Sequence, residues 1–574
     1  MALHVLGIYY FGHDPAACLL KDGKLVAFVE EERFTRKKHA YKTFPLNTIR
    51  FCLNEAKLRM EDIDYITVGW DANKYPEQMR KFYDKSEFKK MKDPATLKWE
   101  ANSLAYYTPA SMKQEIRNNL ENGGFSHVPE IRFFNHHLSH AATAFYPSGY
   151  RKASILTVDG HGEENCLVGW EGEGGRIKKL FEINMPHSLG WFYAAFTKYL
   201  GFEPYDGEGK VMGLAPYGKP DREMKAEMDR IVAVTDEGYR VDPAYIFYGK
   251  HSYADRFTDK MVEAFGKPRA SGEAINDRHR DIAYAAQEKL EEAMLAVTRR
   301  IYNMTKNKNL CIAGGIALNC KMNGYLLRSG YVDSMFPQPI SGDGGSALGS
   351  ALLLSKELLG ENRFIMKNVY FGPSYSDDDV ERELKGTKGI TYKKFRNVEE
   401  ETARIIADGK IVGWFQGRTE FGPRALGDRS ILTDPRKAEM KDIVNNKVKF
   451  RETWRPFCPS MTAESAGDYL DNPHTSPYMI LSFFVKKDKR GVIPAVVHVD
   501  GTARPQTLEK EQNPGFYRLM KEFEKLTGVP VLLNTSFNIR GEPIVCTPKD
   551  ALNCYLKTGM DVLVMHDYIV RKVR

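Results

Sequence analysis

The sequence contains no Cys-x-x-Cys pair, although eight cysteines are spread along its 574 residues. Without such pairs it has neither a zinc ribbon nor a thioredoxin-type redox site. No stretch reaches the ~18 consecutive apolar residues that a membrane-spanning helix needs. The first ten residues also lack the basic and apolar segments of an export signal. We therefore expect a cytoplasmic protein with reduced thiols and no membrane partner.

Strong charge of one sign is also missing. The chain carries 83 lysine and arginine residues against 75 aspartate and glutamate residues, a net charge of +8. Its longest basic run is only three residues, at 36–38, whereas a nucleic-acid-binding protein more often gathers basic residues in one stripe. The charge pattern therefore predicts no nucleic-acid partner. The composition, 42% hydrophobic and 28% charged, is that of a folded protein, and the length predicts several domains.

Two segments of the N-terminal part share one plan of strand, polar turn and strand. The first, over 5–20, encloses a Gly-His-Asp-Pro turn at 12–15. The second, over 154–170, encloses an Asp-Gly-His-Gly turn at 159–162. The repetition indicates a duplicated α/β core. By analogy of fold, such a core is typical of the actin-like and sugar-kinase ATPases, which hold a nucleotide between their two halves.

A change of composition divides the chain. Residues 355–395 are rich in charges and turn-forming residues and have few apolar clusters, so we place a domain boundary near 365. New strands are predicted after it at 411–415 and 531–533. We therefore predict one domain over 1–364 and a second α/β domain over 365–574.

A histidine-rich segment at 135–145 leads into small residues that predict a helix. With Asn135 as its cap, His136 and His140 lie one turn apart on one face. The two imidazoles can share a metal ion or can simply be hydrogen-bonded, and the spacing alone favours neither. A third ligand must come from elsewhere, and Asp343 in a glycine-rich loop is a candidate. Two histidines and one carboxylate favour Fe(II) or another divalent ion over structural zinc.

Three glycine-rich segments, at 207–213, 313–319 and 342–345, are predicted at junctions between a strand and a helix. Backbone N–H groups at such junctions can approach a phosphate. None of the segments is a Walker A or dinucleotide motif, and each alone is most often only a turn. Together they favour a nucleotide cleft in the N-terminal part. The residues assigned to that cleft are Gly209, Lys210, Gly314, Gly315, Asn319 and Gly342.

The C-terminal part is dense in arginine placed among glycine and aromatic residues. Arginine held by turn-forming residues suits bidentate recognition of phosphate oxygens. The alternative is a set of structural arginine–carboxylate pairs, and we favour that alternative for Arg429, Arg451 and Arg540.

These motifs resemble the O-carbamoyltransferase family that modifies antibiotics, other secondary metabolites and nodulation factors. The resemblance extends from residue 12 to residue 545, nearly the whole chain. The matching segments, in the family's order, are GHDPAA, EEERFTRKKHA, NHHLSHAA, DGEGKVMGLAPYG, AGGIALNCKMN, SGDGGSALG, GWFQGRTEFGPRALGDRSIL, KFRETWRPF, HVDGTARPQT and NTSFNIRGEPIV.

The resemblance implies two linked activities. The C-terminal domain is similar to threonylcarbamoyl-adenylate synthases and is expected to make carbamoyl-adenylate from carbamoyl phosphate and Mg-ATP. The N-terminal domain is similar to the actin-like enzyme that transfers threonylcarbamoyl to tRNA. It is expected to move the carbamoyl group to a hydroxyl of a small-molecule acceptor, a natural product or a sugar.

The resemblance also assigns roles to particular residues of this sequence. His13 is the general-base candidate for the acceptor hydroxyl. Fe(II) is expected at His136, His140, Asp343 and Asp159. Carbamoyl phosphate and ATP are expected at Lys449, Arg455, Arg504, Ser536 and Arg424.

Two other classes of function stay open at this point. An actin-like small-molecule kinase would leave residues 400–574 and the histidine pair without a role. A tRNA-directed modification protein or a regulatory binding module would need a basic face that the charge pattern does not show. The acceptor hydroxyl, the metal and the oligomeric state are not set by the sequence, a homodimer being one option.

Overall fold

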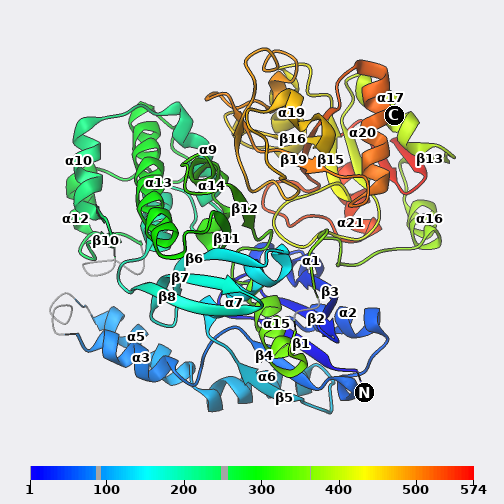
Figure 1. Cartoon of the computed structure of the whole chain (residues 1–574). Helices are drawn as coiled ribbons and strands as arrows, with labels where there is room; N and C mark the ends of the chain where they lie inside the picture. Colours follow the sequence, from blue (N-terminus) through cyan, green and yellow to red (C-terminus); the bar gives the residue numbers. More distant parts are fainter. Residues whose placement is uncertain (1, 86–91, 93, 247–255, 362–363, 574) are drawn as a thin grey trace. The chain divides into compact units, whose positions relative to one another are not determined.

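The structure is a computed structural model that describes residues 2–85, 92, 94–246, 256–361 and 364–573. The chain divides into two compact units, whose elements are labelled in Figure 1. The first unit consists of Met1–Phe11, Ala16–Val26 and Phe44–Ile365. The second consists of Gly12–Pro15, Ala27–Thr43 and Met366–Arg574. Two short N-terminal segments therefore group with the C-terminal part of the chain.

The first sheet of the first unit has the strand order β3-β2-β1-β4-β5. Its strands are β1 (His4–Tyr9), β2 (Ala16–Lys21), β3 (Lys24–Glu30), β4 (Tyr65–Val68) and β5 (Glu130–Phe133). β1 runs antiparallel to β2 and parallel to β4, and β4 runs parallel to β5. Asp22 and Gly23 link β2 to β3 with φ values of 50° and 74°. Two residues with positive φ form a tight hairpin turn.

The second sheet repeats this plan with the order β12-β11-β6-β7-β8. Its strands are β6 (Lys152–Gly162), β7 (Asn165–Glu173), β8 (Arg176–Asn184), β11 (Asn309–Ala313) and β12 (Ser334–Pro337). β6, β7 and β8 are antiparallel neighbours, and β11 and β12 run parallel to β6 on its other side. The shared order confirms the predicted duplicated core of the actin-like and sugar-kinase ATPases.

One helix follows the last strand of each repeat, and the two helices pack on one another (Figure 1). α7 (His136–Phe145) follows β5 and contacts β6 and β11, whereas α15 (Gly345–Leu359) follows β12 and contacts β1, β2 and β4. Glycines permit the close approach, because a Cβ at Gly7 or Gly349 would collide with the backbone of the opposing element. The two helices therefore lie between the two sheets.

Further helices complete the first unit. Helix α13 (Asp277–Thr305) begins at the cap residue Asn276. The unit also contains α2 (Leu46–Ala56), α3 (Tyr75–Tyr83), α5 (Pro94–Tyr106), α6 (Pro109–Asn122), α8 (Leu189–Tyr199), α9 (Glu208–Leu214), α10 (Arg222–Ile231), β9 (Val232–Thr235), β10 (Gly238–Val241), α12 (Asp259–Phe265) and α14 (Cys320–Leu327). Within the described ranges, no helix has both the length and the apolar character that crossing a bilayer requires.

The second unit is α/β, as predicted, and has a mixed sheet of order β13-β22-β21-β14-β15-β20-β16-β19. Helices α17 (Val398–Ala407) and α20 (Pro514–Thr527) pack on each other and on the sheet, and α21 (Pro548–Leu556) contacts β14 and β21. The strands are β13 (Ile390–Lys394), β14 (Val412–Phe415), β15 (Arg429–Thr433), β16 (Cys458–Thr462), β19 (Gln506–Leu508), β20 (Val531–Ser536), β21 (Val562–Met565) and β22 (Tyr568–Lys572).

Candidate active site

The histidine-rich segment forms the start of α7, as its pattern predicts. Asn135 caps the helix, because its side chain accepts a hydrogen bond from Leu138 N at 2.8 Å. His136, His137 and His140 are all buried. His137 differs from the other two: its ring bonds Thr157 Oγ1 and Asn165 O, both at 2.9 Å. It therefore ties the helix to β6 and to the start of β7.

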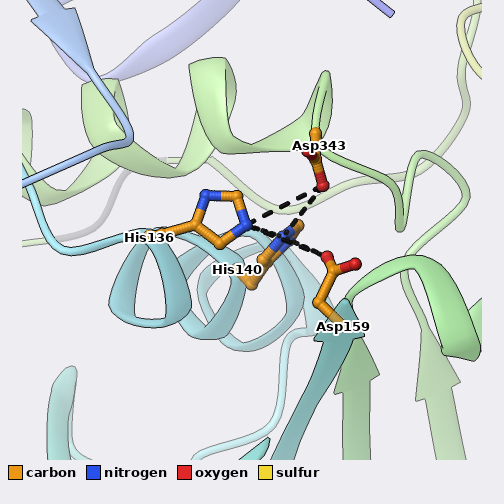
Figure 2. Close-up of side chains that lie close together, drawn as sticks. All are labelled: His136, His140, Asp159 and Asp343. Carbon is orange, nitrogen blue, oxygen red and sulfur yellow. Dashed lines mark hydrogen bonds and ion pairs between the residues drawn. The ribbon is translucent and has the colours of Figure 1, made fainter. Parts of the chain in front are cut away.

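The structure brings His136, His140, Asp159 and Asp343 together (Figure 2). Asp159 lies near the end of β6, and Asp343 lies in the loop before α15. One nitrogen or oxygen atom from each side chain lies within 4.8 Å of the other three. The two Nε2 atoms are 3.0 Å apart, and His140 Nε2 lies 3.1 Å from Asp159 Oδ2. Asp343 Oδ1 lies 3.8 Å from His136 Nε2 and 4.0 Å from His140 Nε2.

Neighbouring groups fix the orientation of three of these side chains, those of His136, Asp159 and Asp343. His136 Nδ1 lies 3.0 Å from Gly69 O, so this nitrogen carries the proton that it donates and Nε2 faces the cluster. Gly160 N donates to Asp159 Oδ1 at 2.7 Å, and Gly315 N donates to Asp159 Oδ2 at 3.2 Å. The hydroxyl of Tyr9 donates to Asp343. The cluster is thus held by both sheets of the first unit.

The electrostatics of the cluster suit a cation. Burial lowers the pKa of His136, but its hydrogen bond to Asp159 and the negative charges of Asp343 and Asp159 raise it overall to about 9. Burial raises the pKa of Asp159, but hydrogen bonds from the two histidines bring it well below its usual value. Imidazole nitrogen and carboxylate oxygen are ligands that Fe(II), Zn²⁺ and Mn²⁺ accept. The donor set therefore fits a divalent metal, although it does not select one.

Gly162 leaves the space that the His136 ring needs. A Cβ at this position would collide with the Cβ, Cγ and Cδ2 atoms of His136. We expect Gly162→Ala to lower the free energy of unfolding by about 1–3 kcal/mol and to weaken metal binding, since the ring must move. Gly386→Ala, where a Cβ has nothing within 4 Å, is the matched control. Denaturant unfolding and metal titration that match wild type would show that His136 does not depend on this space.

A second group of predicted residues meets in the second unit around Lys449. Its Nζ donates to Ser536 O at 2.7 Å, to Asn538 O at 3.0 Å and to Asn538 Oδ1 at 2.6 Å, and lies 3.2 Å from Ser536 Oγ. Within the described residues, Lys449 makes no ion pair with a carboxylate. Burial lowers the pKa of this ammonium well below its usual value, and the nearby Arg451 lowers it further. An anion bound here would favour its charged form.

Three arginines add charge to the same unit. Burial lowers the pKa of Arg451 well below its usual value, and the positive charges of Arg455 and Arg504 lower it further. Arg504 Nε and Nη2 donate to Cys458 Sγ at 3.1 and 3.0 Å. Arg455 Nη1 lies 4.0 Å from Glu452 Oε2. The three arginines carry more positive charge than the single carboxylate of Glu452 can balance. This excess of positive charge suits an anionic ligand.

The other arginines play different parts. Arg429 is fully buried and donates to backbone carbonyls, among them Asp428 O at 3.1 Å, while its guanidinium lies 3.7 Å from the centre of the Phe415 ring. Arg451 Nε donates to Asn445 Oδ1 at 2.7 Å. The expected carboxylate partners are therefore replaced by carbonyl and amide oxygens at these two positions. Arg540 does pair with a carboxylate, Glu452, at 3.6 Å. Arg424 lies in the segment before β15.

His13 lies in the turn between β1 and β2, which belongs to the second unit. Its Nδ1 is 3.0 Å from Asp14 Oδ2, and His39 Nδ1 is 2.7 Å from Asp14 Oδ1. Burial raises the pKa of Asp14, but the hydrogen bonds from both histidines lower it overall, well below its usual value. Asp14 is therefore a carboxylate at neutral pH, and it orients the ring of His13 through Nδ1.

Two of the three glycine-rich segments assigned to a nucleotide cleft lie where the sequence predicts them. Gly314 and Gly315 follow β11, and Gly342 precedes α15, so both segments lie at the predicted strand-to-helix junctions. Asn319 caps α14 and bonds the buried amide of Gln287.

The expected junction at 207–213 is wrong. Gly209 and Lys210 lie inside α9, and the element before α9 is the helix α8, not a strand. Residues 189–199 form that helix because the side chain of Ser188 caps its N-terminus. Lys210 Nζ pairs with Asp206 Oδ2 at 3.3 Å.

Several supporting residues escaped the sequence analysis. Tyr9 lies in an apolar strand, so the sequence does not indicate that its hydroxyl bonds Asp343. Gly69 contacts His136 through its backbone carbonyl, which no side-chain pattern reveals. Glu163 contacts the start of α7 and directly follows the Gly-His-Gly segment, which the structure places at the end of β6 and not in the predicted turn. Burial raises the pKa of its carboxyl to about 7, while the charge of His136 opposes this shift.

Two family models match this chain. The model described as Carbamoyltransferase N-terminus matches residues 4–352, and the model described as Carbamoyltransferase C-terminus matches residues 403–572. Nodulation protein NolNO of Sinorhizobium fredii is 39% identical over 98% of this chain and 79% of its own length. An uncharacterized Synechocystis protein, sll1178, is 39% identical over 99% of this chain and 97% of its own. Nodulation protein U of Rhizobium tropici is 28% identical over 92% of this chain and 90% of its own.

Solved structures are more distant. Component A of the (R)-2-hydroxyglutaryl-CoA dehydratase of Acidaminococcus fermentans is 14% identical and covers 62% of this chain and all of its own, with a TM-score of 0.33. A similarity this low carries no argument about function.

The duplicated core and the buried histidine–aspartate cluster define an actin-like α/β protein with a candidate metal site. The two matching models together span most of the residues, so the chain belongs to the carbamoyltransferase family and is a carbamoyltransferase. The family predicted from the sequence motifs is thereby confirmed.

Proposed function

We propose that the protein is an ATP-dependent O-carbamoyltransferase acting on a hydroxyl of a small-molecule acceptor, a natural product or a sugar. Carbamoyl phosphate, ATP and water give carbamoyl-adenylate, phosphate and pyrophosphate. The acceptor oxygen then attacks the carbamoyl carbon, AMP leaves, and the hydroxyl proton passes to a base. The resemblance of the sequence motifs to the family that modifies antibiotics and nodulation factors supports a small-molecule acceptor, and two relatives are described as nodulation proteins. The cytoplasm suits this reaction, and all eight cysteines of the described chain are free thiols.

We assign adenylate formation to the domain over 365–574. The observation that carries the proposal is the buried Lys449, which makes no ion pair with a carboxylate in the described chain and feels the positive charges of Arg451 and Arg455. Arg504 in turn acts on Arg451. Carbamoyl phosphate and ATP are polyanions that repel one another, so a shared basic pocket is needed to bring them together. Lys449, Arg455, Arg504 and Ser536 would bind the phosphates, and Arg424 would add to them.

We assign carbamoyl transfer to the domain over 1–364. His136, His140, Asp159 and Asp343 would hold a divalent metal, Fe(II) by resemblance to the family. Such a metal supplies Lewis-acid stabilisation of the charge that develops on the leaving adenylate. Gly342 would offer its backbone N–H to the adenylate phosphate. Gly314, Gly315, Gly209, Lys210 and Asn319 would line the rest of the predicted cleft, because Gly314 N and Gly315 N already donate to Ser341 O and to Asp159 Oδ2. Because carbamoyl-adenylate hydrolyses in water, its site must exclude solvent.

His13 is our candidate for the base. Asp14 accepts from its Nδ1, so Nε2 keeps the lone pair that can take the proton of the attacking hydroxyl. We expect His13→Asn to reduce transfer by about 10²–10⁴-fold and to remove the acid limb of its pH–rate profile. Metal content and pyrophosphate release should be unchanged. Transfer at the wild-type rate with the same acid limb would mean that another residue takes the proton.

The acceptor class can be tested directly with the whole protein. Mass spectrometry of reactions that contain ATP, carbamoyl phosphate and a panel of metabolite alcohols should show one product that has gained one carbamoyl group. Omission of either ATP or carbamoyl phosphate should abolish this product. A product that gains a phosphoryl group instead would indicate a small-molecule kinase.

A further inference from the structure

Glu163 is a fully buried carboxylate in the turn that joins β6 to β7. Its Oε1 accepts a hydrogen bond from Asp71 N at 2.6 Å, and its Oε2 accepts one from Asn135 Nδ2 at 2.6 Å. His136 N lies 3.2 and 3.3 Å from the two oxygens. These three partners are all donors, which suits an ionised carboxylate.

Each of the three donors belongs to a segment of the chain that positions His136. Asn135 caps α7, and His136 N belongs to the first turn of that helix. Asp71 stands two residues after Gly69, whose carbonyl accepts from His136 Nδ1. Glu163 itself follows Asp159 by four residues at the end of β6. The carboxylate of Glu163 therefore joins the start of α7, the loop at 69–71 and the end of β6, which meet at the histidine–aspartate cluster.

We propose that Glu163 is a positioning residue for the metal site, a role that rests on the proposed metal function. It holds the start of α7 and the loop at 69–71 against the end of β6. His136 Nε2 is thereby fixed relative to the carboxylate of Asp159. Outer groups of this kind typically change metal affinity by about 10–100-fold when they are replaced.

The backbone of Glu163 is adapted to this role. Its φ is 48°, a left-handed conformation that is unfavourable for a non-glycine residue. The turn accepts this conformation while it directs the carboxylate at the N-terminus of α7, where the helix dipole also favours negative charge. The adjacent Glu164 is only partly buried, and the charges that act on it are those of Glu182, Lys179, Lys85 and Lys81.

The variant Glu163→Gln keeps the size of the side chain but removes one of its two hydrogen-bond acceptors. The glutamine amide has the size of the carboxylate but must turn its NH₂ group toward at least one of the N–H donors, which pushes that segment away. Glu164→Gln is the matched control in the same turn. His136→Ala removes a proposed ligand and reports whether the cluster binds metal at all.

The test is a titration of each full-length variant with Co(II), followed by its visible absorption and by equilibrium dialysis. We expect Glu163→Gln to bind Co(II) about 10–100-fold more weakly and to show an altered absorption band, while Glu164→Gln matches wild type. Carbamoyl-phosphate-dependent pyrophosphate release should stay unchanged in both variants. Wild-type affinity and spectrum in Glu163→Gln would overturn the positioning role.

The failure of the metal site itself would look different. If His136→Ala bound Co(II) as tightly as wild type, the proposed metal function would be wrong, whatever Glu163→Gln did. If Glu163→Gln does not fold, Asn135→Ser takes its place, because serine still caps α7 but cannot reach Glu163 with a donor amide. We expect a several-fold loss of Co(II) affinity there, and an unchanged affinity would overturn the proposal.

Discussion

Replacing His136 with alanine is expected to abolish carbamoyl transfer and to leave adenylate formation nearly intact. The side chain supplies one of four clustered donor atoms, and its Nε2 lies 3.0 Å from that of His140. Loss of the metal would remove several kcal/mol of transition-state stabilisation, which corresponds to at least about 1,000-fold in rate. The measurement is carbamoylated product per minute beside pyrophosphate release by the same preparation.

The control for this variant is His127→Ala, an exposed histidine of the same unit. It should transfer at the wild-type rate and bind the same amount of metal. If both half-reactions fell together in a folded His136→Ala protein, the assignment of the two steps to different domains would be wrong.

Replacing Arg504 with alanine should have the second-largest effect, a loss of adenylate formation. Its guanidinium donates two hydrogen bonds to Cys458 Sγ and stands among the cations around Arg451. A charge-assisted contact to a phosphate is worth about 1.5–3 kcal/mol, so pyrophosphate release should fall by about 10–150-fold. Arg504→Lys should recover only part of this loss, because lysine lacks the planar fork.

Arg518→Ala is the matched control for that series, since Arg518 is an exposed arginine of the second unit that pairs with Glu399. Its pyrophosphate release should equal that of wild type at every carbamoyl phosphate concentration. Unchanged release in Arg504→Ala would remove Arg504 from the phosphate site and leave Lys449 as the main candidate.

Local patterns in the sequence predicted the parts of the site that depend on spacing along one element. The four-residue interval between His136 and His140, with Asn135 as the cap, was sufficient to place both imidazoles on one helix face. The repeated strand–turn–strand plan predicted the duplicated core, because hairpins carry their own turn chemistry. The glycine-rich loop indicates Asp343 as a further ligand, and the family resemblance implies Asp159. The structure brings both carboxylates together with the two histidines.

What the sequence could not predict depends on long-range contacts. Tyr9 reaches Asp343 across 334 positions of the chain, and nothing in an apolar strand marks its hydroxyl. Arg429 looked like half of an ion pair, yet its neighbours in the fold are backbone carbonyls and the Phe415 ring. The glycines at 207–213 lie in and beside a helix, because glycine marks a turn, a cap and a close approach alike.

The central proposal is that ATP is consumed to activate a carbamoyl group, and pyrophosphate release by the full-length protein tests it most directly. With Mg-ATP and no acceptor, we expect pyrophosphate and carbamoyl-adenylate to form only when carbamoyl phosphate is added. Lys449→Met should prevent their formation, since the buried ammonium bonds both Ser536 and Asn538. Formation of ADP from ATP and an alcohol without carbamoyl phosphate would contradict the proposal, and so would a carbamoylated product formed without ATP.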